Sequence, residues 1–167
     1  MNNIALDKKL MFKALKEAKR GIPYVYPNPA VGCLIYDGSK ILSTGYHKKF
    51  GGNHAEHEAI KNLDEMVKGL TMYVSLEPCT HTGKTGACLD LIDPEVFDRV
   101  VIAEKDPNSE ASGSIEKLKK RGIKVDLGLL KHEARKLNKR FYVFHEKKRP
   151  YVILKYASTL DGFIAQE

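Results

Sequence analysis

One histidine and two cysteines in this sequence have the residue types and the order of a zinc site. His54 stands at the predicted start of a helix, Cys79 follows Pro78 behind a predicted strand, and eight residues separate Cys79 from Cys88. Zinc accepts imidazole nitrogen and thiolate sulfur together, and a catalytic zinc keeps its fourth position open for water. The sequence therefore predicts a catalytic zinc site with three protein ligands.

Glu56 stands two residues after His54 and completes this chemistry. Residues i and i+2 of a helix do not face each other, so Glu56 is poorly placed to bind the metal beside His54. Zinc lowers the pKa of bound water towards roughly 7, and a free carboxylate can then take and return protons. One histidine, two cysteines and a free glutamate in this order are typical of zinc-dependent nucleobase deaminases. We expect Glu56 to be the proton shuttle of such a reaction.

Two alternatives concern the same residues. Cys79 and Cys88 could form a disulfide or be two inert buried thiols, although Pro78 and the upstream His54-Ala55-Glu56 favour a metal site. A non-catalytic module stabilised by zinc is the second alternative. Structural zinc sites are closed by four ligands, so three ligands and a free Glu56 argue against it.

Composition predicts one domain with an anionic partner. The chain has 167 residues, 43% of them hydrophobic, and a formal net charge of +7. This length can bury a core, and the charge suits either nucleic acid or a phosphorylated metabolite. Charges interrupt the N-terminal segment and no apolar run is long enough to span a membrane, so we expect no membrane partner. Two cysteines needed as thiolates favour the cytoplasm, and a homo-oligomer remains open.

Helical and extended patterns alternate along the chain and predict an α/β fold. We expect Asp7 to cap a first helix that Gly21 ends, and Asp37-Gly38 to join a hairpin. The predicted strands are 30–36, 40–46, 71–76, 99–103 and 123–127, and the later helices are 54–67, one that ends near 92, 114–121 and 130–145. An antiparallel start followed by strands joined through helices predicts a central mixed β-sheet with helices on both faces.

Further motifs extend over almost the whole chain: residues 27–32 (PNPAVG), 45–47 (GYH), 76–85 (LEPCTHTGKT) and 106–108 (DPN). Together with the zinc motifs they resemble the deaminase half of the bifunctional riboflavin biosynthesis deaminase/reductase. The cysteine spacing is the most specific part, because tRNA adenosine deaminases and many cytosine deaminases have P-C-x-x-C. The resemblance implies a three-layer cytidine deaminase-like fold.

The resemblance also implies a reaction and a set of site residues. The reaction is deamination of 2,5-diamino-6-(ribosylamino)-pyrimidin-4-one 5'-phosphate, with release of ammonia. His54, Cys79 and Cys88 would bind Zn²⁺ and Glu56 would move protons. The residues that match substrate contacts of the family are Asn28, His47, His81, Lys84, Asp106 and Asn108. Ordinary loop structure is the alternative for each of these six. Residues 109–112 depart from the family pattern, which puts the conformation of that loop in doubt.

The C-terminal segment implies a second domain. Residues 151–162 resemble the opening strand and turn of the family's reductase domain, in which Ser158 would touch NADPH. We expect residues 1–146 to be the deaminase domain and 147–167 to be a linker and the truncated start of a reductase, which needs a complete domain to bind NADPH. The rival activity is a nucleic-acid (tRNA adenosine) or free nucleoside deaminase. The lysine-rich helices offer few aromatic stacking positions, so we expect a phosphorylated pyrimidine rather than nucleic acid as the partner.

Overall fold

Five strands form one mixed sheet in the order β2-β1-β3-β4-β5 in the computed structural model, which describes residues 3–65, 67–81 and 86–164. The strands are β1 (Gly32–Tyr36), β2 (Ile41–Tyr46), β3 (Leu70–Val74), β4 (Phe97–Ile102) and β5 (Lys124–Leu127). β1 pairs antiparallel with β2 and β3, whereas β3, β4 and β5 run parallel. The predicted mixed sheet is confirmed.

Within the described residues, five α-helices and one 3₁₀ turn accompany the sheet. They are α1 (Ile4–Lys19), α2 (Ala55–Lys61), η1 (Cys88–Leu91), α3 (Ser114–Lys120), α4 (Lys131–Leu137) and α5 (Lys139–Lys147). The central strands have apolar residues at nearly every position, and successive side chains point to opposite faces. Such strands need cover on both sides.

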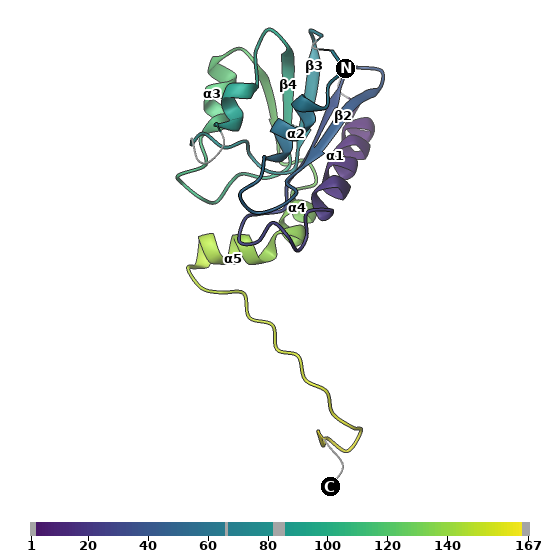
Figure 1. Cartoon of the computed structure of the whole chain (residues 1–167), viewed down its shortest axis with the longest axis vertical. Helices are drawn as coiled ribbons and strands as arrows, with labels where there is room; N and C mark the ends of the chain where they lie inside the picture. Colours follow the sequence, from purple (N-terminus) through teal and green to yellow (C-terminus); the bar gives the residue numbers. More distant parts are fainter. Residues whose placement is uncertain (1–2, 66, 82–85, 165–167) are drawn as a thin grey trace.

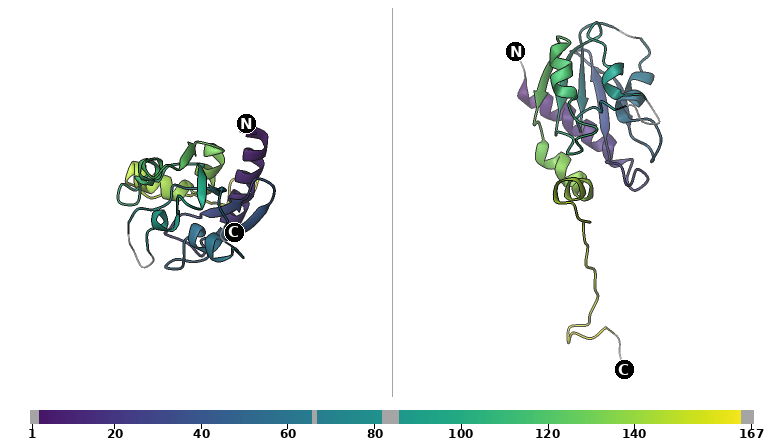
Figure 2. Two further views of the ribbon diagram at one scale, coloured as in Figure 1. Left: turned by 90° about the horizontal axis from the view of Figure 1, so that it is seen from above. Right: turned by 90° about the vertical axis from the view of Figure 1, so that its left-hand side faces the viewer.

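The helices supply that cover as two separate layers. On one face, Cys33, Met72 and Ile102 pack with residues of α2, η1 and α3. On the other face, Leu34 and Tyr73 pack with residues of α1 and α4. Figure 2 shows α1 and α2 on opposite sides of the strands. The predicted three-layer arrangement is therefore confirmed, and the core lies on both faces of the sheet.

Three predicted helix boundaries are wrong. The side chain of Asn3 caps α1 by accepting a hydrogen bond from the Leu6 amide at 3.2 Å, so Asp7 is not the cap. Asp7 is instead buried one turn later. The helix predicted for 54–67 ends at Lys61. The helix predicted for 130–145 is divided at Asn138 into α4 and α5, because Asn138 has non-helical dihedral angles (φ −109°, ψ 32°).

Gly45 permits the close approach of α2 to β2. A Cβ atom at this position would lie 2.3 Å from the carbonyl oxygen of Ala55 and from the amide nitrogen of Ala59. Any larger residue would push the start of α2 away from the sheet. The first turn of α2 carries Glu56, so this contact sets the depth of that carboxylate.

The chain leaves the domain after α5. In Figure 1 residues beyond α5 run outward as an extended tail, and residues 151–164 are exposed along it. Apolar side chains such as Leu154, Leu160 and Ile164 are among the most exposed of the described residues. None of the described helices has both the length and the apolar character needed to span a membrane.

Candidate active site

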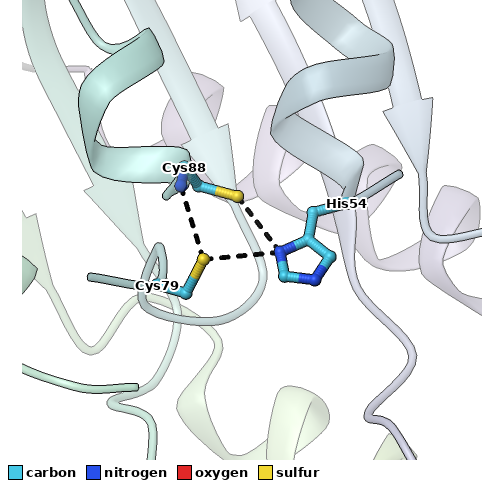
Figure 3. A group of neighbouring side chains, drawn as sticks. All are labelled: His54, Cys79 and Cys88. Atoms are coloured by element: carbon cyan, nitrogen blue, oxygen red, sulfur yellow. Dashed lines mark hydrogen bonds between the residues drawn. The ribbon is translucent and has the colours of Figure 1, made fainter. Parts of the chain in front are cut away.

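His54, Cys79 and Cys88 converge although they belong to three separate segments. His54 is the N-cap of α2, Cys79 lies in the loop after β3, and Cys88 begins η1. The three potential ligand atoms lie within 4.8 Å of one another. The Nδ1 atom of His54 is 3.2 Å from Cys88 Sγ and 3.5 Å from Cys79 Sγ, and all three side chains point at one centre (Figure 3).

The local chemistry of this cluster suits a soft divalent cation. No disulfide joins Cys79 to Cys88, and both thiols are buried. A hydrogen bond from the Cys88 thiol is the largest influence that lowers the pKa of Cys79 to about 4, and the His54 ring lowers it further. The same hydrogen bond and burial raise the pKa of Cys88. One of the two thiols is thus favoured as a thiolate, and a bound cation would stabilise the thiolate form of both.

Glu56 lies beside this cluster and is almost fully buried, with 3% of its surface exposed. Burial is the largest influence on its carboxyl group and raises its pKa to about 6. His54 opposes this shift because its positive charge favours the carboxylate. A buried carboxyl group whose pKa lies near neutrality can both accept and donate a proton.

His47 and Asn28 form a second polar pair. The Nδ1 atom of His47 lies 2.9 Å from the carbonyl oxygen of Asn53, which can only accept, so Nδ1 carries the hydrogen. The other ring nitrogen then accepts from Asn28 Nδ2 at 3.2 Å. Burial lowers the pKa of His47, in agreement with a neutral ring. His47 therefore fixes the orientation of the Asn28 amide.

Asp106 and Asn108 lie in the loop between β4 and α3. Asp106 Oδ1 accepts a hydrogen bond from the Asn108 amide at 2.8 Å, the pattern of an Asx turn. Burial is the largest influence on Asp106 and raises its pKa to about 6. His81, in the loop between the cysteines, is exposed. The turn holds the Asp106 carboxyl group in place, and among the described residues no hydrogen bond occupies its second oxygen.

A cavity of about 700 Å³ joins these groups. The predicted site residues that line it are Asn28, His47, His54, Glu56, Cys79, His81, Asp106 and Asn108. Cys88 lies behind Cys79 and reaches the cluster from η1. Lys84 lies outside the described residues. Ser158 lies on the exposed tail and is not among the residues that line the cavity.

Glu77 is a buried residue of the site that the sequence analysis missed. Its Oε1 atom accepts hydrogen bonds from the Gly113 and Ser114 amides at 2.8 and 3.0 Å, at the start of α3. Its Oε2 atom accepts from the Asp106 amide at 3.3 Å. Glu77 thus ties the loop of Cys79 to the loop of Asp106. Its position two residues before Cys79 could have indicated a role at the site. Its side-chain hydrogen-bond partners, however, lie 29 to 38 residues later in the chain, where the sequence does not reveal them.

Helix α5 is the second feature that the sequence analysis missed. Arg140, Phe141, Phe144 and His145 of α5 line the cavity, together with Tyr151 from the following segment. Asn138, at the joint of α4 and α5, is buried and bonds to Ala30. The sequence pattern of residues 130–145 is that of an ordinary amphipathic helix, so it does not indicate that this segment lines a cavity.

The sequence family described as the cytidine and deoxycytidylate deaminase zinc-binding region matches residues 4–104, which is more than half of the chain. This chain belongs to that deaminase family. The match includes both halves of the histidine and cysteine cluster and the buried Glu56. The His54, Cys79 and Cys88 donors fit the zinc that gives the family its name.

Two relatives of this chain differ in length. The riboflavin biosynthesis protein RibD of Aquifex aeolicus is 47% identical over 161 residues, which cover 96% of this chain and 45% of that protein. The chain thus spans less than half the length of this relative. A protein of Buchnera aphidicola subsp. Schizaphis graminum, named diaminohydroxyphosphoribosylamino-pyrimidine deaminase, is 44% identical over 81% of this chain and 93% of its own length.

Solved structures of related deaminases confirm the fold. A diaminohydroxyphosphoribosylaminopyrimidine deaminase/5-amino-6-(5-phosphoribosylamino)uracil reductase from Thermotoga maritima superposes with a TM-score of 0.91. It is 42% identical, and the match covers 96% of this chain and 47% of that one. The predicted cytidine deaminase-like architecture is therefore correct.

Proposed function

We propose that this chain catalyses the hydrolytic deamination of 2,5-diamino-6-(ribosylamino)-pyrimidin-4-one 5'-phosphate in riboflavin biosynthesis. The observation that carries the proposal is the position of Glu56: a buried carboxyl group that borders the His54 and Cys79 cluster and opens into the same cavity. The name of the short Buchnera relative, which the chain covers nearly in full, supports the choice of a phosphoribosylated pyrimidine.

His54, Cys79 and Cys88 would hold the zinc. When bound, zinc supplies a Lewis acid that makes water a nucleophile near neutral pH. His54, Cys79 and Glu56 line the same cavity, so the reacting carbon of a pyrimidine bound there would lie beside Glu56. Their burial keeps bulk water from the thiolates.

Glu56 carries the protons. It takes a proton from the attacking water, gives it to a ring nitrogen, and then delivers a proton to the exocyclic amine. The carbon gains a bond to the water oxygen and loses its bond to nitrogen, which leaves as ammonia. A pKa raised to about 6 suits this role, because the same group must act as base and then as acid.

The polar pairs would orient the pyrimidine. The Asn28 amide, fixed by His47, offers one remaining N–H and its oxygen to the ring. Asp106 would face the amino groups of the substrate from the other loop, held by Glu77 and the Asn108 amide. His81 and Lys84 would bind from the loop between the cysteines.

We also propose that residues 1–146 form the deaminase domain and that 147–167 form a linker and the beginning of a reductase domain. The exposed apolar residues of the tail support this, since such side chains are normally covered in a folded domain. NADPH binding near Ser158 would require the complete second domain. Metal-binding thiolates favour residence in the reducing cytoplasm.

An ammonia-release assay tests the proposed function. The zinc-loaded protein is offered the pyrimidine phosphate beside cytidine, adenosine and tRNA at equal concentrations. We expect turnover of the pyrimidine phosphate alone. Turnover of tRNA or of a free nucleoside, with none of the pyrimidine phosphate, would assign the site to the rival class.

A further inference from the structure

We propose that Arg140 of α5 binds the phosphate group of the substrate. This inference rests on the proposed function and deepens it, because it names the residue that selects a phosphorylated ligand. Arg140 lines the same cavity as Glu56. It lies beyond residue 104, outside the segment that matches the deaminase family.

The charges around the cavity single out this residue. Among the described residues that line it, Arg140 is the only arginine, and no lysine is present. Three acidic residues line the same cavity: Glu56, Glu77 and Asp106. Burial lowers the pKa values of both His47 and His145, which favours their neutral forms. The other two histidines that line the cavity are His54, which belongs to the metal cluster, and His81, on the loop between the cysteines. A phosphate group would avoid the acidic side of the cavity and be attracted to Arg140.

The Arg140 guanidinium is available to a ligand and is held in position. No ion pair joins it to an acidic group in the described part of the chain. Its Cζ atom lies 5.0 Å from the centre of the Tyr26 ring, and Tyr26 also lines the cavity. Stacking on an aromatic face leaves the N–H groups at the edge of the guanidinium free, and these groups match the oxygens of a phosphate.

Two anchors hold α5 at the cavity. Asn138 joins the start of the helix to Ala30 through two hydrogen bonds. Tyr142 is buried, and the Arg135 guanidinium lies 4.3 Å from the centre of its ring. Figure 1 shows α5 across one end of the domain. Arg140 therefore stands on a fixed wall, so it can recognise a group at a defined distance from the reacting ring.

Substitution of Arg140, with two substrates compared, tests this role. We would measure KM for the pyrimidine ribosyl phosphate and for its dephosphorylated ribosyl counterpart in wild type, Arg140→Ala and Arg140→Lys. A lost charge-assisted hydrogen bond predicts a rise in KM of about ten- to a hundred-fold for the phosphorylated substrate only. Arg140→Lys should fall between wild type and Arg140→Ala, since lysine retains the charge but loses the paired N–H groups. Equal KM changes for both substrates would overturn the proposal.

Lys139→Ala is the matched control, because Lys139 is the neighbouring cation on α5 and does not line the cavity. We expect it to leave both KM values within about two-fold of wild type, as is usual for exposed charges. A KM rise in Lys139→Ala equal to that in Arg140→Ala would mean that only the general charge of the helix matters, and would overturn the proposal.

Calorimetric binding of ribose 5-phosphate separates this inference from the proposed function. Arg140→Ala should bind this probe at least ten-fold more weakly than wild type and Lys139→Ala. If wild type released no ammonia but bound the probe through Arg140, the proposed function would fail and the phosphate site would stand. If Arg140→Ala bound the probe as wild type does, the phosphate site would be refuted whatever the activity.

Discussion

The side-chain amide of Asn138 binds both backbone polar groups of Ala30, which lies 108 residues earlier in the chain. Its Oδ1 atom accepts from the Ala30 amide at 2.8 Å, and its Nδ2 atom donates to the Ala30 carbonyl oxygen at 2.9 Å. All of these groups are buried, so no water replaces a lost partner. Asn138 also divides α4 from α5. It therefore joins the helix that forms one wall of the cavity to the loop of Asn28 that forms another.

We expect Asn138→Asp to weaken substrate binding. Aspartate keeps an acceptor for the Ala30 amide but has no N–H for the Ala30 carbonyl, and it places a charge in a buried position. The two walls should then shift, and KM should rise by about ten-fold or more with the zinc content unchanged. Steady-state kinetics and elemental analysis of the folded protein measure the two effects.

Asn62→Asp is the control for this variant. The Asn62 side chain also donates to a backbone carbonyl, that of Thr44 at 3.0 Å, but it is exposed and does not line the cavity. Its KM should match that of wild type. A lower melting temperature in Asn138→Asp without any change of KM would show that Asn138 serves stability alone.

Glu56→Gln should retain zinc and lose the chemistry. Glutamine keeps the size of the side chain but cannot accept the proton from water, and general acid/base catalysis contributes about 10²–10⁴-fold. The decrease in kcat should reach the upper end of that range, because one group serves several proton transfers. Zinc content is measured in the same sample. Loss of zinc would make Glu56 a ligand or a support of the ligands, and an activity within a few-fold of wild type would refute the proton shuttle.

Cys79→Ser should lower the zinc content from one ion per chain to a small fraction. The serine hydroxyl does not ionise near neutral pH, so one of the two soft thiolate donors is lost. Cys33→Ala is the control, because Cys33 is a buried cysteine on β1 outside the ligand cluster. Elemental analysis should show full zinc in Cys33→Ala. Undiminished zinc in Cys79→Ser would contradict the ligand assignment.

Asp7→Asn should destabilise the fold at neutral pH and much less in acid. Asp7 binds the Arg99 guanidinium at 2.8 and 3.0 Å, and this pairing is the largest influence that lowers its pKa. A lowered folded pKa means that the carboxylate stabilises the fold above its unfolded pKa of about 3.9. That stabilisation is lost as the pH falls through the folded value.

Urea unfolding at two pH values checks this prediction. At pH 7 we expect Asp7→Asn to lose about 1–3 kcal/mol, the scale of hydrogen bonds to charged groups. The difference from wild type should shrink as the pH falls below about 4. Asp64→Asn changes an exposed carboxylate outside both core clusters and should differ little from wild type at either pH. A pH-independent difference in Asp7→Asn would mean that the carboxylate charge is not the cause.

The sequence alone predicted the layered fold and the histidine and cysteine cluster that the structure brings together. His54, Cys79, Cys88 and Glu56 could be singled out as candidates because metal ligation and proton transfer require particular residue types in a particular order. The strands and helices, and their order along the chain, could be predicted because hydrophobic runs, turn residues and helix periodicity are local properties of the sequence. The Asn28, His47, Asp106 and Asn108 positions came from family motifs, and the structure places them at one cavity.

Only the tertiary structure decided which residues far apart in the sequence become partners and which of them line the cavity. Asp7 matches a helix cap in the sequence, yet it pairs with Arg99, 92 residues later, because burial against β4 offers it a guanidinium. Asn138 matches the interior of a helix, yet its amide bonds to Ala30 and breaks the helix. Arg140 matches a solvated surface charge and is exposed in the structure, but it also lines the cavity. Such roles depend on partners that local pattern cannot supply, since hydrogen bonds and charge pairing form between whichever groups the packed layers bring together.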